Sequence, residues 1–447
     1  MPIMSQATAA QEDPYLAGLA RNFQMLLSHP EYSLEVSRVL ASFDLLALES
    51  EATRVMGKKY CTGSYPIAQG GFNTVFVLTF EDGTDIIGRL ARSAFNDNAE
   101  YSEEMLTYSL LSEVATLAFV KQHTSIPVPE VYHVEPNARN PVGARYMLME
   151  RIVGHPLGTT WNTMSPQQRQ QVVTQLAGME AELLSTRFPA IGSLIDGKGT
   201  LGPLGISATY PFALRDPLRG PFTSSKDFLV AHIRCELSLL KETPQDWVRQ
   251  RAQWSNLNGG VDDIPASYAT QWFQLLLDGI LSLAPDDFEP QDFALFHDDF
   301  ELKNILISDC GTVVGVIDWE GSRICPLWNT SRCSSFLQGE FLDDEHEVAS
   351  LRQLQKDIIE GKTGKEYPGT SPLRLGTLLY IVDYTHSVMS SRVKMDGLFL
   401  TWFKVLTNIG YKKVLEPFLP LKRFIEAADQ EPEHIAPSSS LTEISTV

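Results

Sequence analysis

The chain has 447 residues, 43% of them hydrophobic, which is enough to build one large or two medium domains with an ample core. Its formal net charge of −19 disfavours a nucleic-acid partner, because phosphate backbones are bound by clustered Lys and Arg. The five cysteines are scattered without metal-ligand spacing. We therefore expect reduced thiols, no disulfide and no structural zinc.

We expect neither a secretory signal nor a membrane segment in this chain. Residues 1–14 lack the charged start and apolar core of a secretory signal. The best apolar stretch, residues 272–284, is shorter than the roughly 18 residues that a span needs and is interrupted by polar side chains. We predict no membrane span, and no obligate protein partner is evident.

The first part of the chain changes from helical to strand-like spacing. Residues 1–60 are predicted to form a helical N-terminal extension. Residues 74–80 and 85–91 are strand-length runs on either side of an Asp-Gly pair, which indicates a hairpin. Residues 101–121 have helical spacing, and residues 146–152 form a buried strand. Together residues 61–155 are predicted to be a strand-rich N-terminal lobe.

The remainder of the chain is mainly helical in its spacing. Residues 156–429 are predicted to form a helical C-terminal lobe, interrupted by a polar, Gly- and Pro-rich excursion over residues 191–225. Residues 430–447 are rich in Ser, Glu and Pro and are predicted to be disordered. The predicted helices are residues 166–184, 228–240, 268–284, 373–390 and 398–406. The predicted fold class is therefore α+β.

The strongest functional motif is HDDFELKNILISDCGTVVGVIDW, residues 297–319. Two strand-length runs joined by a turn at Gly311 predict a hairpin, which returns Asp318 to the side of Asn304. Their oxygens would then converge on a hard cation. Mg²⁺ fits, because it usually takes only one or two protein oxygens and completes its shell with water and substrate phosphates.

Asp299 precedes the hairpin by five residues and can face the same ion. Phosphoryl transfer needs positioning, charge neutralisation and a group that accepts the hydroxyl proton, and Asp299 suits this last role. We interpret His297 as a core histidine that holds the loop rather than as a catalytic group, and Asp298 as a local helper. Glu320 stays open between support of the metal site and an exposed turn.

A second motif, AQGGFNTVF, covers residues 68–76 and precedes the first strand of the predicted hairpin. Gly70 and Gly71 would let backbone amides, together with Asn73, approach a phosphate group closely. An ordinary turn is the alternative. The motif of residues 297–319 favours a loop that covers a nucleotide.

These motifs resemble the aminoglycoside phosphotransferase family, in its fungal branch, over residues 65 to 328. The resemblance is carried by HxDxxxxNIL, IDWEG and GGFNTVF, and by SEVATLAFVKQHTSIPVPEVY. It implies a protein-kinase-like two-lobed fold and transfer of the γ-phosphoryl group of ATP, with Mg²⁺, to a hydroxyl of a small-molecule acceptor. The family's base corresponds to Asp299, and its metal ligands correspond to Asn304 and Asp318.

The same resemblance implies further nucleotide contacts. Where kinase-like families usually have a Lys that holds the phosphates and pairs with a helix Glu, this chain has Arg89, with Glu113 as the candidate partner. The alternative is that both side chains are solvated. Backbone groups from Glu150 to Ile152 would meet the adenine edge.

The rival to an active small-molecule kinase is a pseudokinase-like module that binds nucleotide without turnover, a hypothesis motivated by Arg89. A protein kinase is disfavoured, because residues 319–341 contain no APE-type ending. Some members of the fungal branch are associated with mitochondria, yet residues 1–19 contain no basic side chain. We therefore predict a cytoplasmic protein.

Overall fold

The computed structural model describes residues 23, 25, 28, 33–57, 59–70, 72–92, 102–206, 218–248, 264–283, 292–327, 337, 344–365, 392–408 and 412–428. The chain divides into two compact units. The first contains Met1–Phe228 and Pro290–Pro372, and the second contains Leu229–Glu289 and Leu373–Val447. The predicted helix at residues 373–390 and the predicted tail at residues 430–447 lie outside the described residues.

A five-stranded antiparallel sheet of order β1-β2-β3-β5-β4 begins the first unit. Its strands are β1 (Cys61–Gln69), β2 (Asn73–Phe80), β3 (Asp85–Ala91), β4 (Val131–Glu135) and β5 (Tyr146–Glu150). The predicted hairpin is present as β2 and β3, and Gly83 in its turn has a φ of 80° that favours glycine. β1 contains Pro66 beside a register shift, which a strand tolerates at the edge of a sheet.

The two faces of this sheet are covered by different helices. On one face, Leu78, Leu90 and Leu148 pack with Leu48 and Phe43. The last two come from the segment of α2 (Ser33–Ala41) and α3 (Leu45–Met56). These N-terminal helices are therefore part of the sheet's hydrophobic core.

The opposite face of the sheet carries the residues that lie between those core positions in sequence. Arg89 and Met147 are cross-strand neighbours on β3 and β5, and both line a cavity together with residues of α5 (Glu103–His123). The alternation follows from the period of two in a strand. The face that the N-terminal helices leave uncovered is thus the face that holds Arg89.

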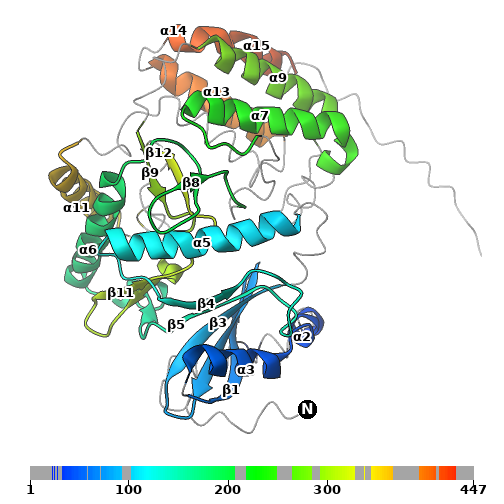
Figure 1. The fold of residues 1–447 in the computed structure, drawn as a ribbon. Helices are drawn as coiled ribbons and strands as arrows, with labels where there is room; N and C mark the ends of the chain where they lie inside the picture. The colour runs from blue at the N-terminus through cyan, green and yellow to red at the C-terminus, as the bar shows by residue number, and fades with distance from the viewer. Residues whose placement is uncertain are drawn as a thin grey trace, which may run out of the picture. The chain divides into compact units, whose positions relative to one another are not determined.

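Helix α5 corresponds to the helix predicted at residues 101–121. Ser102 caps its N-terminus by accepting a hydrogen bond from the backbone N–H of Met105, and acidic residues occupy its first turn. It ends at the Thr124 cap, just before the proline-containing segment. In Figure 1, α5 (cyan) lies beside the sheet, and it contacts β4 and β7 (Ser193–Leu194).

Within its described residues, the rest of the first unit holds three small antiparallel sheets, with orders β11-β10-β6, β12-β9 and β7-β8. Helix α6 (Pro166–Ser185) starts with a capping box and packs on α11 (Glu345–Thr363) through a small apolar cluster. The other elements are β6 (His155–Pro156), η2 (Leu157–Thr159), η3 (Trp161–Thr163), β8 (Leu201–Gly202), β9 (Phe293–Phe296), η5 (Leu302–Asn304), β10 (Ile305–Ile307), β11 (Val313–Val316) and β12 (Arg323–Pro326).

The second unit is helical where it is described. Its elements are most of α7 (Ser225–Glu242), α9 (Ala266–Ser282), α13 (Arg392–Asn408), α14 (Lys412–Leu415), η8 (Glu416–Phe418) and α15 (Leu419–Ala428). Buried aromatic rings of Trp272, Phe399, Trp402 and Phe418 make edge-on and tilted contacts in its core. Within the part of the chain that the structure describes, no helix is long and apolar enough to cross a membrane.

Leu48 tests the packing of the N-terminal helices on the sheet. Leu48 is 0% exposed, whereas Leu46 on the same helix is 78% exposed. Leu48→Ala should lower the free energy of unfolding by about 2–5 kcal/mol because it leaves a cavity in the core. Leu46→Ala removes the same atoms from the surface and should cost less than about 0.5 kcal/mol. Urea denaturation followed by circular dichroism measures both, and equal effects would contradict this packing.

Candidate active site

The predicted hairpin of residues 305–318 is formed by β10 and β11. Ile305 pairs with Val316, and the backbone N–H of Ile317 donates to the carbonyl oxygen of Asn304 at 2.9 Å. Asn304 is the last residue of the short helix η5. Its hydrogen bond with Ile317 places it beside the residue that precedes Asp318. The hairpin therefore brings Asn304 and Asp318 to the same end, as the motif spacing predicted.

The loop before the hairpin holds Asp299 against Asn304. The amide nitrogen of Asn304 donates to the Asp299 carboxylate at 2.9 Å and to the Asp299 carbonyl oxygen at 2.8 Å. The ammonium group of Lys303 lies 2.8 Å from the same carboxylate oxygen, Oδ2. The Asp299 side chain is 27% exposed, so it is oriented by neighbours while still open to solvent.

His297 ties this loop to the segment that follows β11. Its Nδ1 accepts the backbone N–H of Asp299 at 3.2 Å, and its Nε2 lies 3.1 Å from the carbonyl oxygen of Ile317. This pattern corresponds to a neutral ring that donates from Nε2. Burial lowers the pKa of His297 and so favours this neutral form. The interpretation of His297 as a core histidine that holds the loop is confirmed.

Asp298 forms a buried ion pair with Arg323 at the start of β12. The two charged groups are 2.7 Å apart, and their side chains are 0% and 5% exposed. The pair therefore connects the loop of Asp299 to the strand that follows the Asp318 turn. Removal of one partner of such a buried pair would leave the other charge buried without its counter-ion, which destabilises the fold.

Asp318 occupies a strained backbone position. Its φ is 64°, and among the described residues other than glycine it alone has a positive φ. Aspartate visits this left-handed region more readily than most residues, but at an energetic cost that local structure must offset. The next residue, Trp319, anchors the turn, because its ring is 1% exposed and its N–H donates to Val316 at 3.0 Å.

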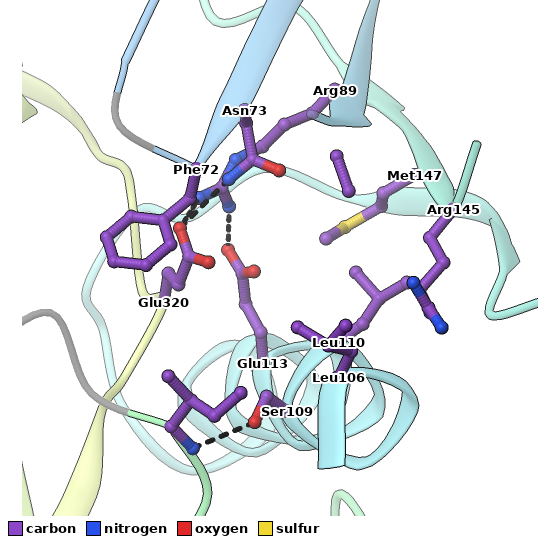
Figure 2. Close-up of a pocket in the computed structure, with 12 residues that line it drawn as sticks. Phe72, Asn73, Arg89, Leu106, Ser109, Leu110, Glu113, Arg145, Met147 and Glu320 are labelled. Carbon is purple, nitrogen blue, oxygen red and sulfur yellow. Dashed lines mark hydrogen bonds and ion pairs between the residues drawn. The ribbon is translucent and has the colours of Figure 1, made fainter. Parts of the chain in front are cut away.

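Arg89 is the centre of an ion-pair cluster that Figure 2 shows in part. One terminal nitrogen of its guanidinium pairs with Glu113 of α5. The other lies 2.7 Å from the Asp318 carboxylate and 2.6 Å from Glu320. The amide of Asn73 donates to the same oxygen of Glu320 at 2.9 Å. Arg89 and Glu113 are only 11% and 5% exposed, so the solvated alternative for this pair is wrong.

The charges of this cluster are unequal. Burial by itself would lower the pKa of Arg89, but its three carboxylate partners raise it above its ordinary value. Burial also raises the pKa values of Glu113 and Glu320, and the neighbouring carboxylates raise them further. Glu113 and Glu320 therefore hold protons more readily than ordinary carboxyl groups, so the cluster carries less negative charge than three ionised carboxylates would give it.

A cavity of about 60 Å³ adjoins the cluster, between the sheet and α5. Figure 2 shows Arg89, Glu113 and Glu320 together at one side of it, and Met147, Leu106 and Leu110 toward the other side with Arg145. Three predicted site residues, Asn73, Arg89 and Glu113, line this cavity. The other lining residues are Phe72, Ala91, Leu106, Ser109, Leu110, Arg145, Met147, Ile206 and Glu320.

The glycine loop is described up to Gly70, while Gly71 lies outside the described residues. The N–H of Gly70 donates to the carbonyl oxygen of Asn73 at 2.9 Å, and its own carbonyl oxygen accepts from Arg92 at 2.7 Å. These two hydrogen bonds hold the backbone of Gly70 close to the start of β2. Contact of Gly70 or Gly71 with a phosphate group stays a prediction.

Glu150 and Ile152 lie at the end of β5 and just beyond it. The N–H of Glu150 donates to Glu130 at 2.8 Å, and its carboxylate accepts the N–H of Glu130 at 3.1 Å. Ile152 covers Gly315 of β11 so closely that a side chain at Gly315 would meet it. This segment is thus tied to the hairpin, and its contact with adenine stays a prediction.

Glu320 is the site residue that the sequence left undecided. Its signal was only its position, two residues after Asp318, and this position fits an exposed turn as well as support of the metal site. In the structure Glu320 contacts both Arg89 and Asn73, and a role in supporting the metal site stays a prediction.

The sheet, the helix that pairs with Arg89 and the loop and hairpin of residues 297–319 define a protein-kinase-like fold. The model of the phosphotransferase enzyme family matches residues 66–329. The chain belongs to this phosphotransferase family, and the predicted family and fold class are confirmed.

Three comparisons illustrate how distant the relatives are. A subtelomeric hrmA-associated cluster protein of Aspergillus fumigatus is 28% identical over 320 residues, which cover 61% of this chain and 60% of that protein. The protein named altered inheritance of mitochondria protein 9, mitochondrial, of Candida tropicalis is 28% identical over 234 residues, covering 49% and 36%. The solved streptomycin–ATP–APH(2'')-IIa ternary complex is 11% identical with a TM-score of 0.46, covering 80% and 95%. The chain spans less than two thirds of the length of the two curated relatives.

Arg323 tests the buried ion pair beside the Asp299 loop. Arg323→Met leaves the Asp298 carboxylate buried without this partner and should lower the free energy of unfolding by about 3–5 kcal/mol. The double variant Asp298→Leu with Arg323→Met removes both charges and should recover most of that loss. Chemical denaturation measures both variants. A double variant less stable than the single one would contradict the pairing.

Proposed function

We propose that the protein transfers the γ-phosphoryl group of ATP to a hydroxyl group of a small molecule. The observation that carries this proposal is the convergence at Arg89 of three segments: β3, helix α5 and the turn after β11. Phosphoryl transfer depends mainly on positioning and on charge neutralisation. A guanidinium fixed between a helix and an acidic turn supplies both.

Asp299 is the proposed base. An ionised carboxylate only accepts hydrogen bonds, and Asp299 is already oriented by the amide of Asn304 and the ammonium group of Lys303. Its partial exposure would let an incoming hydroxyl group reach it. Positioning contributes much of the rate in this class of reaction, and these contacts position the carboxylate.

Asn304 and Asp318 are the proposed magnesium ligands, and their chemistry fits the ion. The amide nitrogen of Asn304 is used twice by Asp299, which leaves the amide oxygen for a hard cation. Asp318 adds a carboxylate, which is a preferred ligand of this ion. Among the described residues no three His, Cys, Asp or Glu side chains form a metal site, so water and phosphate would complete the shell. When bound, Mg²⁺ would neutralise charge on the phosphates.

The proposed nucleotide contacts extend from the phosphates to the adenine ring. Arg89, held by Glu113, would bind phosphate oxygens, and the loop of Gly70, Gly71 and Asn73 would cover them. Guanidinium groups are well suited to phosphate oxygens. The backbone near Glu150 and Ile152 would receive the adenine edge, at the opposite end of β3 and β5 from Asn73.

The acceptor is a hydroxylated small molecule whose identity the described residues do not specify. For the cellular compartment we keep the cytoplasm as the prediction. A mitochondrial location is the outcome that would overturn it, because several relatives carry the word mitochondrial in their names. Fractionation of cells that express the tagged protein distinguishes the two.

Phosphorylation of a metabolite library tests the proposed function. Purified protein is incubated with Mg-ATP and hydroxylated metabolites, and phosphorylated products are detected by mass spectrometry. We expect transfer to one class of metabolite, and we expect Asp318→Ala to abolish it. Nucleotide binding by the wild type without transfer or ATP turnover would favour the pseudokinase-like module instead. Absence of nucleotide binding would remove the proposal altogether.

Asp299→Asn tests the proposed base. The substitution keeps the size of the side chain but removes the group that accepts the proton, so turnover should fall by about 10²–10⁴-fold. Affinity for Mg-ATP, measured by calorimetry, should change little. Asp309→Asn is the matched control, because Asp309 lies in the β10–β11 turn with its side chain 95% exposed. A loss of turnover of equal size in both variants would point to instability of the hairpin instead.

A further inference from the structure

Glu320 lies where three segments of the site meet, although no motif assigned it a role. A single carboxylate oxygen, Oε2, accepts the amide of Asn73 at 2.9 Å and the guanidinium of Arg89 at 2.6 Å. Asn73 begins β2 directly after the glycine loop, and Arg89 lies on β3. One oxygen from the turn after β11 therefore links the loop and the strand.

We propose that Glu320 is a positioning residue that fixes Asn73 and the Arg89 guanidinium in the geometry that binds the phosphates of ATP. The proposal rests on the proposed function, since it assigns the phosphate end of that same site. Glu320 acts through Arg89 and Asn73.

The guanidinium explains why Arg89 requires such a residue. A planar fork presents its donors in fixed directions, whereas the ammonium of a lysine is a point charge that can turn toward any partner. One terminal nitrogen of Arg89 faces α5 through Glu113, and the other faces the turn after β11. Glu320 accepts a hydrogen bond from this second nitrogen and also contacts Asn73. Without Glu320, the second nitrogen would be held by Asp318, which is also a proposed metal ligand.

The contacts of Glu320 separate this role from that of a metal ligand. Both donors converge on Oε2, so the carboxylate is directed at Arg89 and Asn73. Its side chain is 31% exposed, while that of Asp318 is 38% exposed. A glutamine at position 320 keeps an oxygen that can accept both hydrogen bonds, but it is a much poorer ligand for Mg²⁺ than a carboxylate. The Gln and Ala variants therefore give different results for the two roles.

The first experiment compares Glu320→Ala with Glu320→Gln in the full chain. Loss of a hydrogen bond to a charged group should raise the KM for Mg-ATP by about tenfold in Glu320→Ala, with a smaller change in kcat. Glu320→Gln should recover most of the affinity, and the Mg²⁺ concentration that gives half-maximal activity should stay unchanged. Glu81→Ala, in the exposed β2–β3 turn, is the control. A Gln variant as impaired as the Ala variant, with weaker Mg²⁺ activation, would overturn the proposal in favour of a metal ligand.

A double-mutant cycle tests the link to the loop. Asn73→Ala and Glu320→Ala should each weaken Mg-ATP binding measured by calorimetry, and the double variant should bind no more weakly than Glu320→Ala alone. Strictly additive losses would overturn the proposal. Melting temperatures of all variants identify any that fail to fold, and Glu320→Gln then supplies the decisive comparison.

Different results would remove the role of Glu320 and the proposed function. Wild-type protein that binds Mg-ATP and phosphorylates an acceptor, but gives an additive cycle, would remove only the role of Glu320. Wild-type protein that binds no Mg-ATP would remove the proposed function and the role of Glu320 together. Binding without transfer would remove the proposed catalysis, while a non-additive cycle in binding affinity would still support Glu320.

Discussion

The buried guanidinium of Arg89 is the constraint on which the site depends. A charge taken out of water needs partners of opposite sign, and Arg89 finds them on α5 and on the turn after β11. Helix, sheet and hairpin must therefore meet at one point. Asp318 accepts a strained left-handed backbone at that point, held by the buried ring of Trp319. The cluster thus couples the position of α5 to the geometry of the hairpin.

The direction of Arg89 is set by the opposite face of the sheet. Leu90 lies in the core that α3 covers, so its neighbour on β3 must face α5. A slip of one residue in register would turn Arg89 into an apolar layer and expose Leu90. Gly88 allows close packing there, because a side chain at that position would collide with Leu78. The N-terminal helices therefore support the site through the register of the sheet, without contributing a residue to it.

What the sequence could predict depended on how far apart the partners lie along the chain. The hairpin and the contact between Asp299 and Asn304 are local, and motif spacing was enough to predict their proximity. The pairing of Arg89 with Glu113 came from resemblance to a family. Glu320 could not be assigned, because its partners Asn73 and Arg89 are 247 and 231 residues away. Strand β1 was missed for a different reason, since its Gly, Pro and register shifts hide the alternation of a regular strand.

The presence of arginine where related families have lysine bears on whether the site can turn over substrate. A guanidinium has more donors in fixed directions than an ammonium group has. An arginine here would bind poorly if its only acceptors were those that suffice for a lysine. Here the fork has an additional acceptor in Glu320, and that acceptor also holds the loop over the proposed phosphate site. The substitution and its compensation thus lie in one cluster, which argues for a working variant of the site over a decayed one. Every contact in this cluster belongs to the proposed phosphate end of the site.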